Sequence, residues 1–299
     1  ALVDDPAATQ AVQAESHLHR RTLAGYAALD WRPSDSLALR GELRGTWERL
    51  ATNSVTANFL PSFGTAIPEQ RFHDVTPRVS VDYAWNPLLR TYASAAKGSR
   101  SGGVNPLPGL VPEEQTYEPE SNWTYEVGLR QAGHGVLREL RLTAYYIDWQ
   151  DTQIRGFSTT PGVPSLVVLN TAGVITKGIE ASVIAQPAEW ARAEFYYSMV
   201  DPEFRYGSDD PSAGDICGLS AGNSTSTFCT VGPPRTSSPN SSGLVPWLDG
   251  GVPAGVARNS WHGALILTPR PATSGMQVTF RADLIRQDSR YDRGVNAFT

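Results

Sequence analysis

Hydrophobic and polar side chains alternate with a period of two along most of the chain. In residues 37–48, Leu39, Leu43 and Trp47 share one parity, while charged side chains occupy the other. A period of two is that of a β-strand with two different faces, and no comparable stretch has the spacing of an amphipathic helix. The pattern therefore predicts an all-β chain. The same alternation recurs in residues 75–85, 123–130, 140–146, 191–198, 261–267 and 278–284.

The strands predicted by this pattern are long, and their connections follow a rule. Many strands reach the roughly 9–11 residues that a tilted strand needs to cross a bilayer. Short turns, as at 33–36 and 133–135, alternate with long connections, as at 51–73 and 206–258. Such alternation is typical of an antiparallel up-and-down barrel with one tight rim and one elaborated rim. The ten expected strands are 16–32, 37–50, 74–86, 89–98, 122–133, 137–157, 166–186, 190–205, 259–269 and 276–290.

Tryptophans lie within or at the ends of these expected strands. A transmembrane barrel places such residues in girdles at both membrane interfaces, because the indole ring is apolar and its N–H is polar. We therefore interpret the chain as a transmembrane β-barrel. A soluble β-rich binding module is the alternative, and it would need the apolar strand faces to be buried against another sheet. The residues concerned are Trp31, Trp47, Trp85, Trp123, Trp149, Trp190 and Trp261.

The composition narrows the classes of function. Of the 299 residues, 40% are hydrophobic and 18% are charged, and 25 Lys and Arg against 30 Asp and Glu give a net charge of −5. A weakly acidic chain without a basic tract is a poor candidate for binding nucleic acid. No run approaches the ~18 apolar residues of a membrane-spanning helix. This excludes a helical membrane protein but not a membrane barrel, whose alternating strands are hidden in hydropathy averages.

Two motifs of common enzymes are missing from the sequence. It has no His-Glu-x-x-His motif and no phosphate-binding loop. The only dyads that suggest a hydrolase are His73-Asp74 and Asp209-Asp210, and the first would point to opposite faces of a strand. We therefore expect that the chain is not an enzyme and carries no cofactor.

Two histidines and two cysteines are candidate metal ligands. His17 and His19 share a strand face but lack a third ligand nearby, and Cys217 and Cys229 lack a Cys-x-x-Cys spacing. We therefore expect no metal site. In an exported protein, Cys217 and Cys229 are expected to form a disulfide that closes a local loop, whereas in a reducing compartment they would be free thiols.

Several short motifs follow one another in a fixed order. Together they resemble the C-terminal barrel region of TonB-dependent outer-membrane receptors, over about residues 74–205. Each motif alone is weakly specific, but their order makes the resemblance strong. The motifs are Gly98-Ser99-Arg100-Ser101-Gly102-Gly103-Val104-Asn105, Tyr117-Glu118-Pro119-Glu120, Tyr125-Glu126-Val127-Gly128-Leu129-Arg130, Ala144-Tyr145-Tyr146-Ile147-Asp148-Trp149, Asn170-Thr171-Ala172-Gly173 and Lys177-Gly178-Ile179-Glu180.

This resemblance implies a fold, a location and an activity. Receptors of this family form a 22-stranded barrel in the outer membrane of Gram-negative bacteria, closed by an N-terminal plug domain. They bind scarce nutrients, often ferric siderophores, at the outer face and import them with energy from TonB. The implied partners are outer-membrane lipid, TonB and an extracellular ligand such as a ferric siderophore.

About ten strands would make less than half of such a barrel. Residues 1–299 are therefore expected to form a partial barrel, and both ends look like cuts in a longer chain. The plug, its TonB box, the first strands and the last strands have no counterpart. The alternative is a small closed ten-stranded outer-membrane barrel with an enzyme or adhesin role.

The resemblance also implies roles for individual residues. Glu120, Glu126 and Glu180 are expected on the lumen side of the wall, opposite Arg130 and Arg141, because a charge facing mid-bilayer lipid costs about 2–4 kcal/mol. Ten motif residues are expected to shape the barrel: Gly98, Gly102, Gly103, Pro119, Glu120, Tyr125, Glu126, Gly128, Gly178 and Glu180. The ligand-binding candidates on the long loops are Arg100, Asn105, Arg235, Trp247 and Asp249.

Overall fold

The structure of the protein is a computed structural model. It describes residues 14–57, 67–107, 109–158, 160, 165–208, 229–231, 244–246, 248, 250–269 and 277–291. Among these residues, no helix is both long enough and apolar enough to cross a membrane.

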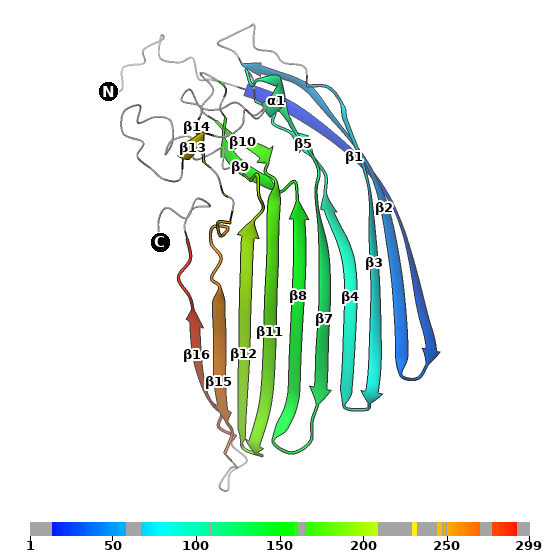
Figure 1. Ribbon diagram of the computed structural model, residues 1–299, viewed down its shortest axis with the longest axis vertical. Helices are drawn as coiled ribbons and strands as arrows, with labels where there is room; N and C mark the ends of the chain where they lie inside the picture. Colours follow the sequence, from blue (N-terminus) through cyan, green and yellow to red (C-terminus); the bar gives the residue numbers. More distant parts are fainter. Residues whose placement is uncertain are drawn as a thin grey trace, which may run out of the picture.

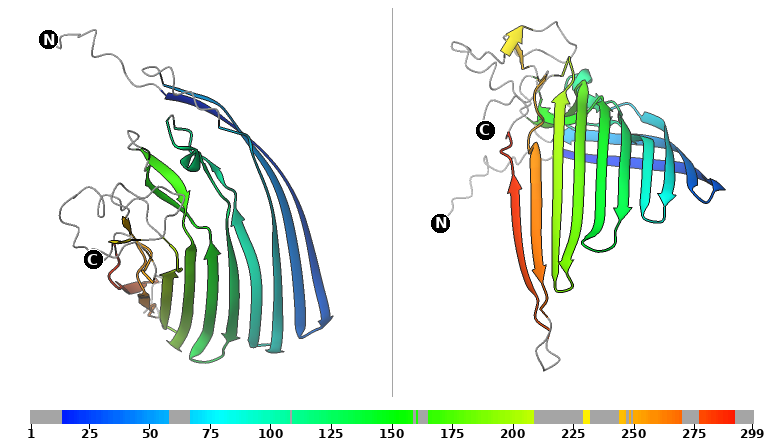
Figure 2. Two further views of the ribbon diagram at one scale, coloured as in Figure 1. Left: turned by 45° about the horizontal axis from the view of Figure 1, so that its top comes forward. Right: turned by 60° about the horizontal axis from the view of Figure 1, so that its bottom comes forward.

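One antiparallel sheet of ten strands forms the body of the molecule (Figure 1). Each inner strand pairs with the strand before it and the strand after it in the sheet, so the order along the sheet is the order along the chain. The sheet curves like part of a barrel wall (Figure 2), and β1 and β16 form its two edges. The strands are β1 (Ala14–Ser34), β2 (Leu37–Ala57), β3 (Gln70–Asn86), β4 (Leu89–Arg100), β7 (Glu120–Ala132), β8 (Leu137–Gln150), β11 (Gly173–Ala188), β12 (Ala191–Phe204), β15 (Asn259–Leu267) and β16 (Phe280–Gln287).

This arrangement confirms the prediction of an all-β chain with ten long strands in an up-and-down order. Because β1 and β16 are not paired with each other, the ten strands do not close into a small barrel of their own. The alternative of a closed ten-stranded barrel is therefore wrong for this sheet.

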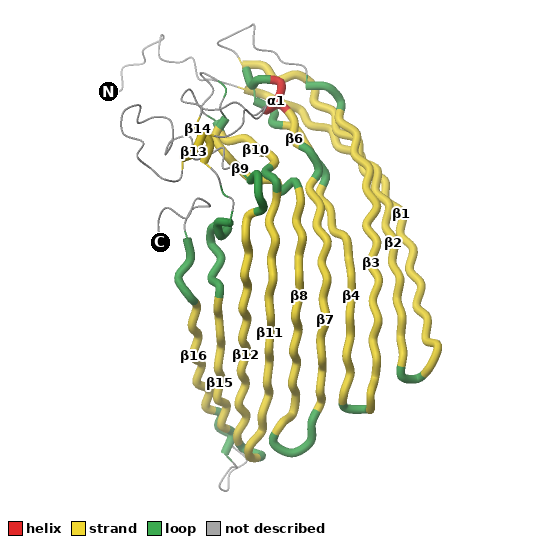
Figure 3. Tube along the Cα trace, viewed as in Figure 1, coloured by secondary structure: helices red, strands yellow, loops and turns green. Residues whose placement is uncertain are grey.

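The remaining elements gather at one end of the sheet (Figure 3). Short turns join β1 to β2, β3 to β4, β7 to β8 and β11 to β12 at the opposite end, as the alternation of connections predicts. We call the end with the longer connections the elaborated rim. Its elements are β5 (Gly103–Val104), α1 (Pro112–Gln115), β6 (Thr116–Tyr117), β9 (Gln153–Phe157), β10 (Leu166–Asn170), β13 (Cys229–Val231) and β14 (Leu244–Pro246).

Two of the predicted strands were too long. Residues 137–157 and 166–186 were expected to be continuous, but β8 ends at Gln150 and β11 begins at Gly173. Between them, β9 and β10 pair with each other as a separate hairpin. The breaks fall where the backbone leaves the extended region: φ is +53° at Asp151 and +138° at Gly173. The hydrophobic pattern does not reveal such a break, because the side chains of β9 and β10 continue to alternate with a period of two.

The register of the sheet separates two faces. Trp47 lies opposite Leu23, and Leu39 lies opposite Trp31, so the apolar residues of β1 and β2 share one face. Leu23 is 71% exposed and Trp47 is 57% exposed. No second sheet among the described residues covers this apolar face. A soluble β-rich module would need such a second sheet to cover its apolar face. We call the exposed apolar face of this sheet the outer face.

The outer apolar band has the height of a membrane barrel. On β3 it runs from Val75 to Trp85, both more than half exposed. Ten residues at ~3.4 Å each extend about 34 Å along a strand. At a tilt of about 45° this length spans roughly 24 Å, close to the ~25 Å band of outer-membrane barrels.

Packing is concentrated at the elaborated rim rather than in the middle of the wall. Leu50, Ile67 and Val104 form one buried cluster, against which Phe72 packs. A second cluster joins Val174, Phe204 and Leu248. Trp149 packs on the second cluster, so the expectation that it belongs to an interfacial girdle was wrong.

Two glycines of the family motifs lie under tyrosine rings on the lumen face. A Cβ on Gly128 would overlap the ring of Tyr92, and one on Gly178 would overlap the ring of Tyr145. The Tyr92 hydroxyl lies 3.1 Å from the Thr143 hydroxyl of β8. Each ring thus lies flat across a neighbouring strand, an arrangement that requires a residue without a side chain there.

Substituting Gly128→Ala should therefore destabilise the wall. Tyr92 would have to leave its place over β7, and overpacking of this kind costs about 1–3 kcal/mol. The measurement is urea unfolding of the protein in lipid vesicles, followed by tryptophan fluorescence. Gly41→Ala is the matched control, because a Cβ at Gly41 meets no atom within 4 Å. Equal unfolding midpoints for the two variants would contradict this account.

Candidate functional site

A cavity of about 900 Å³ lies on the lumen side of the wall beside the elaborated rim, and we call it the rim cavity. It is bounded by the rim ends of β1 to β4, the start of β7 and the loop that precedes it. Cations and anions are mixed on its surface. Its charged lining residues are Arg44, Glu48, Asp74, Lys97, Arg100, Glu118, Glu120 and Asp151.

Asp74 joins β3 to β4 at this cavity. Its carboxylate accepts a hydrogen bond from Lys97 Nζ at 2.9 Å and another from the Ser99 hydroxyl. Backbone pairing between these two strands ends at Arg78 and Ala96, before this level is reached. The side chains of Asp74, Lys97 and Ser99 therefore hold β3 and β4 together where their backbones have separated.

Glu120 connects the cavity to the β9–β10 hairpin. It is 5% exposed, and its carboxylate accepts a hydrogen bond from the backbone N–H of Gln153 at 2.6 Å. Arg100 approaches the same carboxylate at 3.6 Å. The Gln153 side chain donates in turn to the carbonyls of Ser101 and Glu118, at 2.9 and 3.0 Å. Glu120 therefore orients a charged side chain of the cavity and anchors the hairpin.

Asn170 makes a second connection between the hairpin and the loop before β7. Its side-chain NH₂ donates to the carbonyls of Glu118 and Asp151, at 2.9 and 2.7 Å, and its oxygen accepts from the Glu118 N–H at 2.8 Å. Asn170 and Gln153 hold the loops beside the cavity, and neither was among the site residues predicted from the sequence. Asn170 begins the family-like motif Asn170-Thr171-Ala172-Gly173, so the sequence did mark this position.

Asn105 lies inside the rim rather than on its surface. It is 5% exposed, and its NH₂ donates to the carbonyls of Glu114 and Val168, both at 2.8 Å. Its oxygen accepts from the Val168 N–H at 2.9 Å. Since its side chain is occupied in joining two loops, we leave Asn105 out of the candidate ligand surface.

Glu114 continues this contact between the loops. It is 3% exposed and accepts hydrogen bonds from the hydroxyls of Ser158 and Thr160, the latter at 2.8 Å. With Asn105, Glu120, Gln153 and Asn170 it forms a set of polar contacts that ties residues 101–120 to residues 151–172. We call this set the rim network.

The remaining motif residues are distributed as follows. Gly98 and Pro119 line the rim cavity, while Gly102 and Gly103 lie so close to Tyr117 that a Cβ at either position would overlap it. Tyr125 points outward and stacks on Trp123, with ring centroids 6.1 Å apart.

Glu126 and Glu180 line a second lumenal cavity of about 560 Å³, which also contains Arg130 and Arg141. The structure thus places these carboxylates and arginines on the same side of the wall. The rim cavity, the second cavity and the rim network all face the lumen or the elaborated rim.

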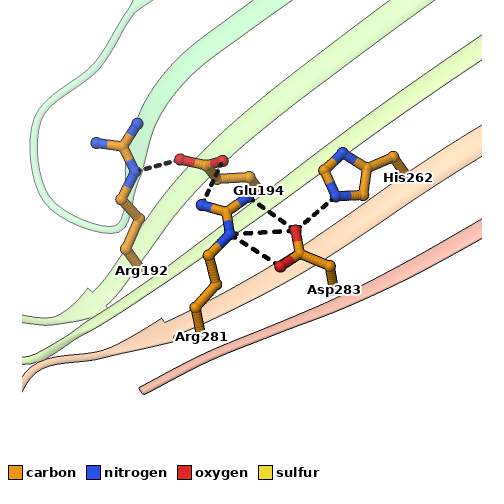
Figure 4. A network of polar contacts seen from close by, with 5 residues as sticks. All are labelled: Arg192, Glu194, His262, Arg281 and Asp283. Atoms are coloured by element: carbon orange, nitrogen blue, oxygen red, sulfur yellow. Dashed lines mark hydrogen bonds and ion pairs between the residues drawn. The ribbon is translucent and has the colours of Figure 1, made fainter. Parts of the chain in front are cut away.

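A ladder of charges crosses the lumen face of the last three strands (Figure 4). Glu194 of β12 lies 2.7 Å from Arg192 and 4.0 Å from Arg281 of β16. Asp283 lies 2.8 Å from Arg281 and 2.7 Å from the His262 ring. These contacts connect β16 to β12 and β15 through side chains that alternate in charge.

Several predicted residues lie outside the described part of the chain. These are Arg235, Trp247, Asp249 and the Asp209-Asp210 dyad. Cys217 is also outside it, and only the backbone of Cys229 is described, in β13. Ligand binding by the loop and the disulfide stay predictions. Among the described residues, no group of three or more His, Cys, Asp or Glu side chains is placed to hold a metal ion.

An antiparallel wall with an apolar outer face, a charged lumen and one elaborated rim defines the class of outer-membrane β-barrels. Within this class the assignment is specific: a family model described as "TonB dependent receptor-like, beta-barrel" matches residues 3–283. The chain belongs to this family. It is therefore a Gram-negative outer-membrane protein of a receptor family rather than an enzyme.

Several solved structures with the same fold are named as receptors for siderophores or their ferric complexes. The chain is similar to the ferric yersiniabactin uptake receptor FyuA from Yersinia pestis, with 16% identity, a TM-score of 0.68, and 96% of this chain and 37% of that chain covered. It is also similar to the siderophore receptor PiuA from Acinetobacter baumannii, with 13% identity, a TM-score of 0.65, and 95% of this chain and 35% of that chain covered. For BauA, the ferric preacinetobactin receptor of the same organism, the identity is 17% and the TM-score is 0.61, with 96% of this chain and 35% of that chain covered.

At these identities the likeness establishes the fold alone. The chain spans only a little over a third of the length of each of these receptors. The matched region thus corresponds to one section of a longer protein in each case.

Removing the carboxylate of Glu114 should loosen the rim network. In Glu114→Ala the hydroxyls of Ser158 and Thr160 lose their acceptor, which costs about 1–3 kcal/mol in a buried site. Amides of β9 and β10 should then exchange with deuterium about tenfold faster or more, measured by mass spectrometry. Glu113→Ala, on the same short helix but exposed, is the control. Unchanged exchange in Glu114→Ala would mean that the network does not hold the hairpin.

Proposed function

We propose that this chain forms part of the barrel wall of an outer-membrane receptor that binds a ferric siderophore and imports it with energy from TonB. In this proposal the chain supplies ten strands of a 22-stranded barrel. The open sheet and the share of the solved receptors that the chain spans both support this division. Barrels of this size have a plugged lumen, so the charged lumen face would contact a plug domain.

The observation that carries the proposal is the rim cavity with its network of loops. A receptor that binds a scarce ligand benefits from a surface already held in shape, because less ordering entropy is lost on binding. The rim network provides such a surface: buried Glu114 and Glu120 fix loops that come from distant parts of the chain. The cavity volume of about 900 Å³ is in the range of small-molecule sites.

Arg100 is the best candidate for contact with the ligand. Its side chain is 68% exposed at the edge of the cavity, whereas its partner Glu120 is buried. A siderophore presents oxygen-rich, negatively charged groups around the iron, and a guanidinium suits such groups because it offers several donors in a planar fork. The neighbours are named for ferric yersiniabactin, a siderophore and ferric preacinetobactin, which supports the same class of ligand.

Outer-membrane lipid is the partner proposed for the other side of the wall. The exposed leucines, valines and tryptophans of the outer face would be in contact with acyl chains and, at the two ends, with headgroups.

The test is uptake of iron by cells that lack their own siderophore receptors. Cells expressing the full-length receptor that carries this chain should take up radioactive iron from a panel of ferric siderophores. The uptake should stop when TonB is deleted. A receptor that is folded in the outer membrane but supports no TonB-dependent uptake of any ferric siderophore would refute the proposal.

Replacing Arg100 should weaken ligand binding more than folding. We expect Arg100→Gln to raise the Kd of the imported siderophore about tenfold or more, as for loss of one charge-assisted hydrogen bond. Binding is measured by tryptophan fluorescence on the purified receptor. Arg90→Gln is the control, since Arg90 lies on the same strand near the short turn and contacts Asp82 at 3.5 Å. Equal affinities of the two variants would remove Arg100 from the site.

A further inference from the structure

The outer face carries a row of arginines where β1, β2 and β3 approach the elaborated rim. Arg21 lies directly opposite Arg49, and Arg49 lies directly opposite Arg71. All three have the parity of the apolar outer residues. The side chains of Arg49 and Arg71 are 55% and 74% exposed, and Arg21 is exposed as well. We call these three residues the arginine row.

The row lies immediately above the apolar band. Arg21 is two residues from Leu23 and Arg49 is two residues from Trp47, so each of these two arginines lies one outward-facing position beyond an exposed apolar side chain. On β3, His73 lies between Arg71 and the exposed Val75 and also lines the groove described next. Together with Trp47 and Phe72 these residues line a shallow groove of about 540 Å³. In a membrane barrel, the position next to the aromatic girdle is the level of the lipid headgroups.

The charges of the row are only partly compensated within the protein. Like charges directly opposite each other destabilise a sheet, and this row repeats that arrangement twice. Glu69 contacts both Arg49 and Arg71, the latter at 2.7 Å. Hydrogen bonds from Arg71 and Arg49 hold the pKa of the Glu69 carboxyl below its ordinary value. Arg49 and Arg71 share the carboxylate of Glu69, and across the described residues no carboxylate contacts Arg21. The row therefore carries three positive charges against one negative charge, a surplus of two.

We propose that the arginine row binds the phosphate of an anionic lipid headgroup in the outer leaflet. This inference rests on the proposed contact of the outer face with lipid. A phosphate offers acceptor oxygens that match the guanidinium fork, and its negative charge relieves the repulsion along the row. The lipid is favoured over free phosphate because the groove opens onto the apolar band, where Leu23 and Trp47 would contact the acyl chains.

The test measures lipids retained by the full-length receptor in detergent, by native mass spectrometry. The receptor is titrated with phosphatidylglycerol, which is anionic, and with phosphatidylcholine, which is zwitterionic. Wild type should retain phosphatidylglycerol in preference. Arg21→Gln/Arg49→Gln leaves Arg71 paired with Glu69, which removes the surplus charge, and should lower that preference about thirtyfold. Arg21→Lys/Arg49→Lys should keep most of it.

The control is Arg40→Gln/Arg78→Gln, which removes two arginines from the lumen face of β2 and β3. It makes the same change in net charge on the opposite side of the wall and should retain phosphatidylglycerol like wild type. Equal lipid preference in both Gln variants would overturn the proposal. Displacement of phosphatidylglycerol from the wild-type receptor by millimolar inorganic phosphate would overturn the proposal too, because the site would then recognise the free anion.

Two further readouts separate this inference from the proposed function. Each variant must show the same heat-dependent shift on a gel as the folded wild type, so that a loss of lipid reports on the row. Iron uptake is measured on the same variants. A receptor that imports iron but shows no lipid preference refutes the row alone, and one that shows the preference without importing any siderophore refutes only the proposed function.

Discussion

Strand register is the constraint on which the rest of this structure depends. Because side chains alternate between faces, a slip of one residue would move Leu43 and Trp47 into the lumen and Arg44 and Glu48 into lipid. A charge at mid-bilayer costs about 2–4 kcal/mol, and a slipped strand would bring several. Hydrogen bonds alone do not select the register, since every register satisfies a similar number of them. The selection comes from the side chains, and the position of every cavity and charge described above follows from it.

The wall and the rim are stabilised in different ways. Along the wall, backbone hydrogen bonds and aromatic rings lying over Gly128 and Gly178 hold neighbouring strands, and little is buried. At the rim the backbones separate, and packing and side-chain hydrogen bonds replace the ladder. Asp74 with Lys97 shows the transition: these side chains join β3 and β4 beyond the last backbone pair. The geometry of the rim therefore depends on particular side chains, whereas that of the wall depends mainly on its backbone ladder.

The limits of the sequence prediction follow from the same difference. Strands, their faces and the alternation of turns could be predicted because each depends on local periodicity. The hairpin of β9 and β10 could not, since its start depends on a positive φ at Asp151. Few non-glycine residues adopt a positive φ, and although Asp does so more often than most, the residue type alone does not predict it. Asn105 was expected at a ligand surface because it stands in a loop motif, yet one of its partners, Val168, lies 63 residues away. Contacts of that separation leave no signal in a single sequence.

The unpaired edges of the sheet support the proposal that this wall is part of a larger barrel. Backbone groups in lipid have no water to bond, so a membrane sheet must close or be covered. Among the described residues, β1 and β16 each pair on one side only, although both carry the apolar outer face that lipid would contact. The charge ladder of Arg281 and Asp283 fixes β16 to its neighbours on the lumen side but satisfies none of its outer backbone groups. In the proposed receptor, further strands that pair with both edges would satisfy these groups and enclose the lumen.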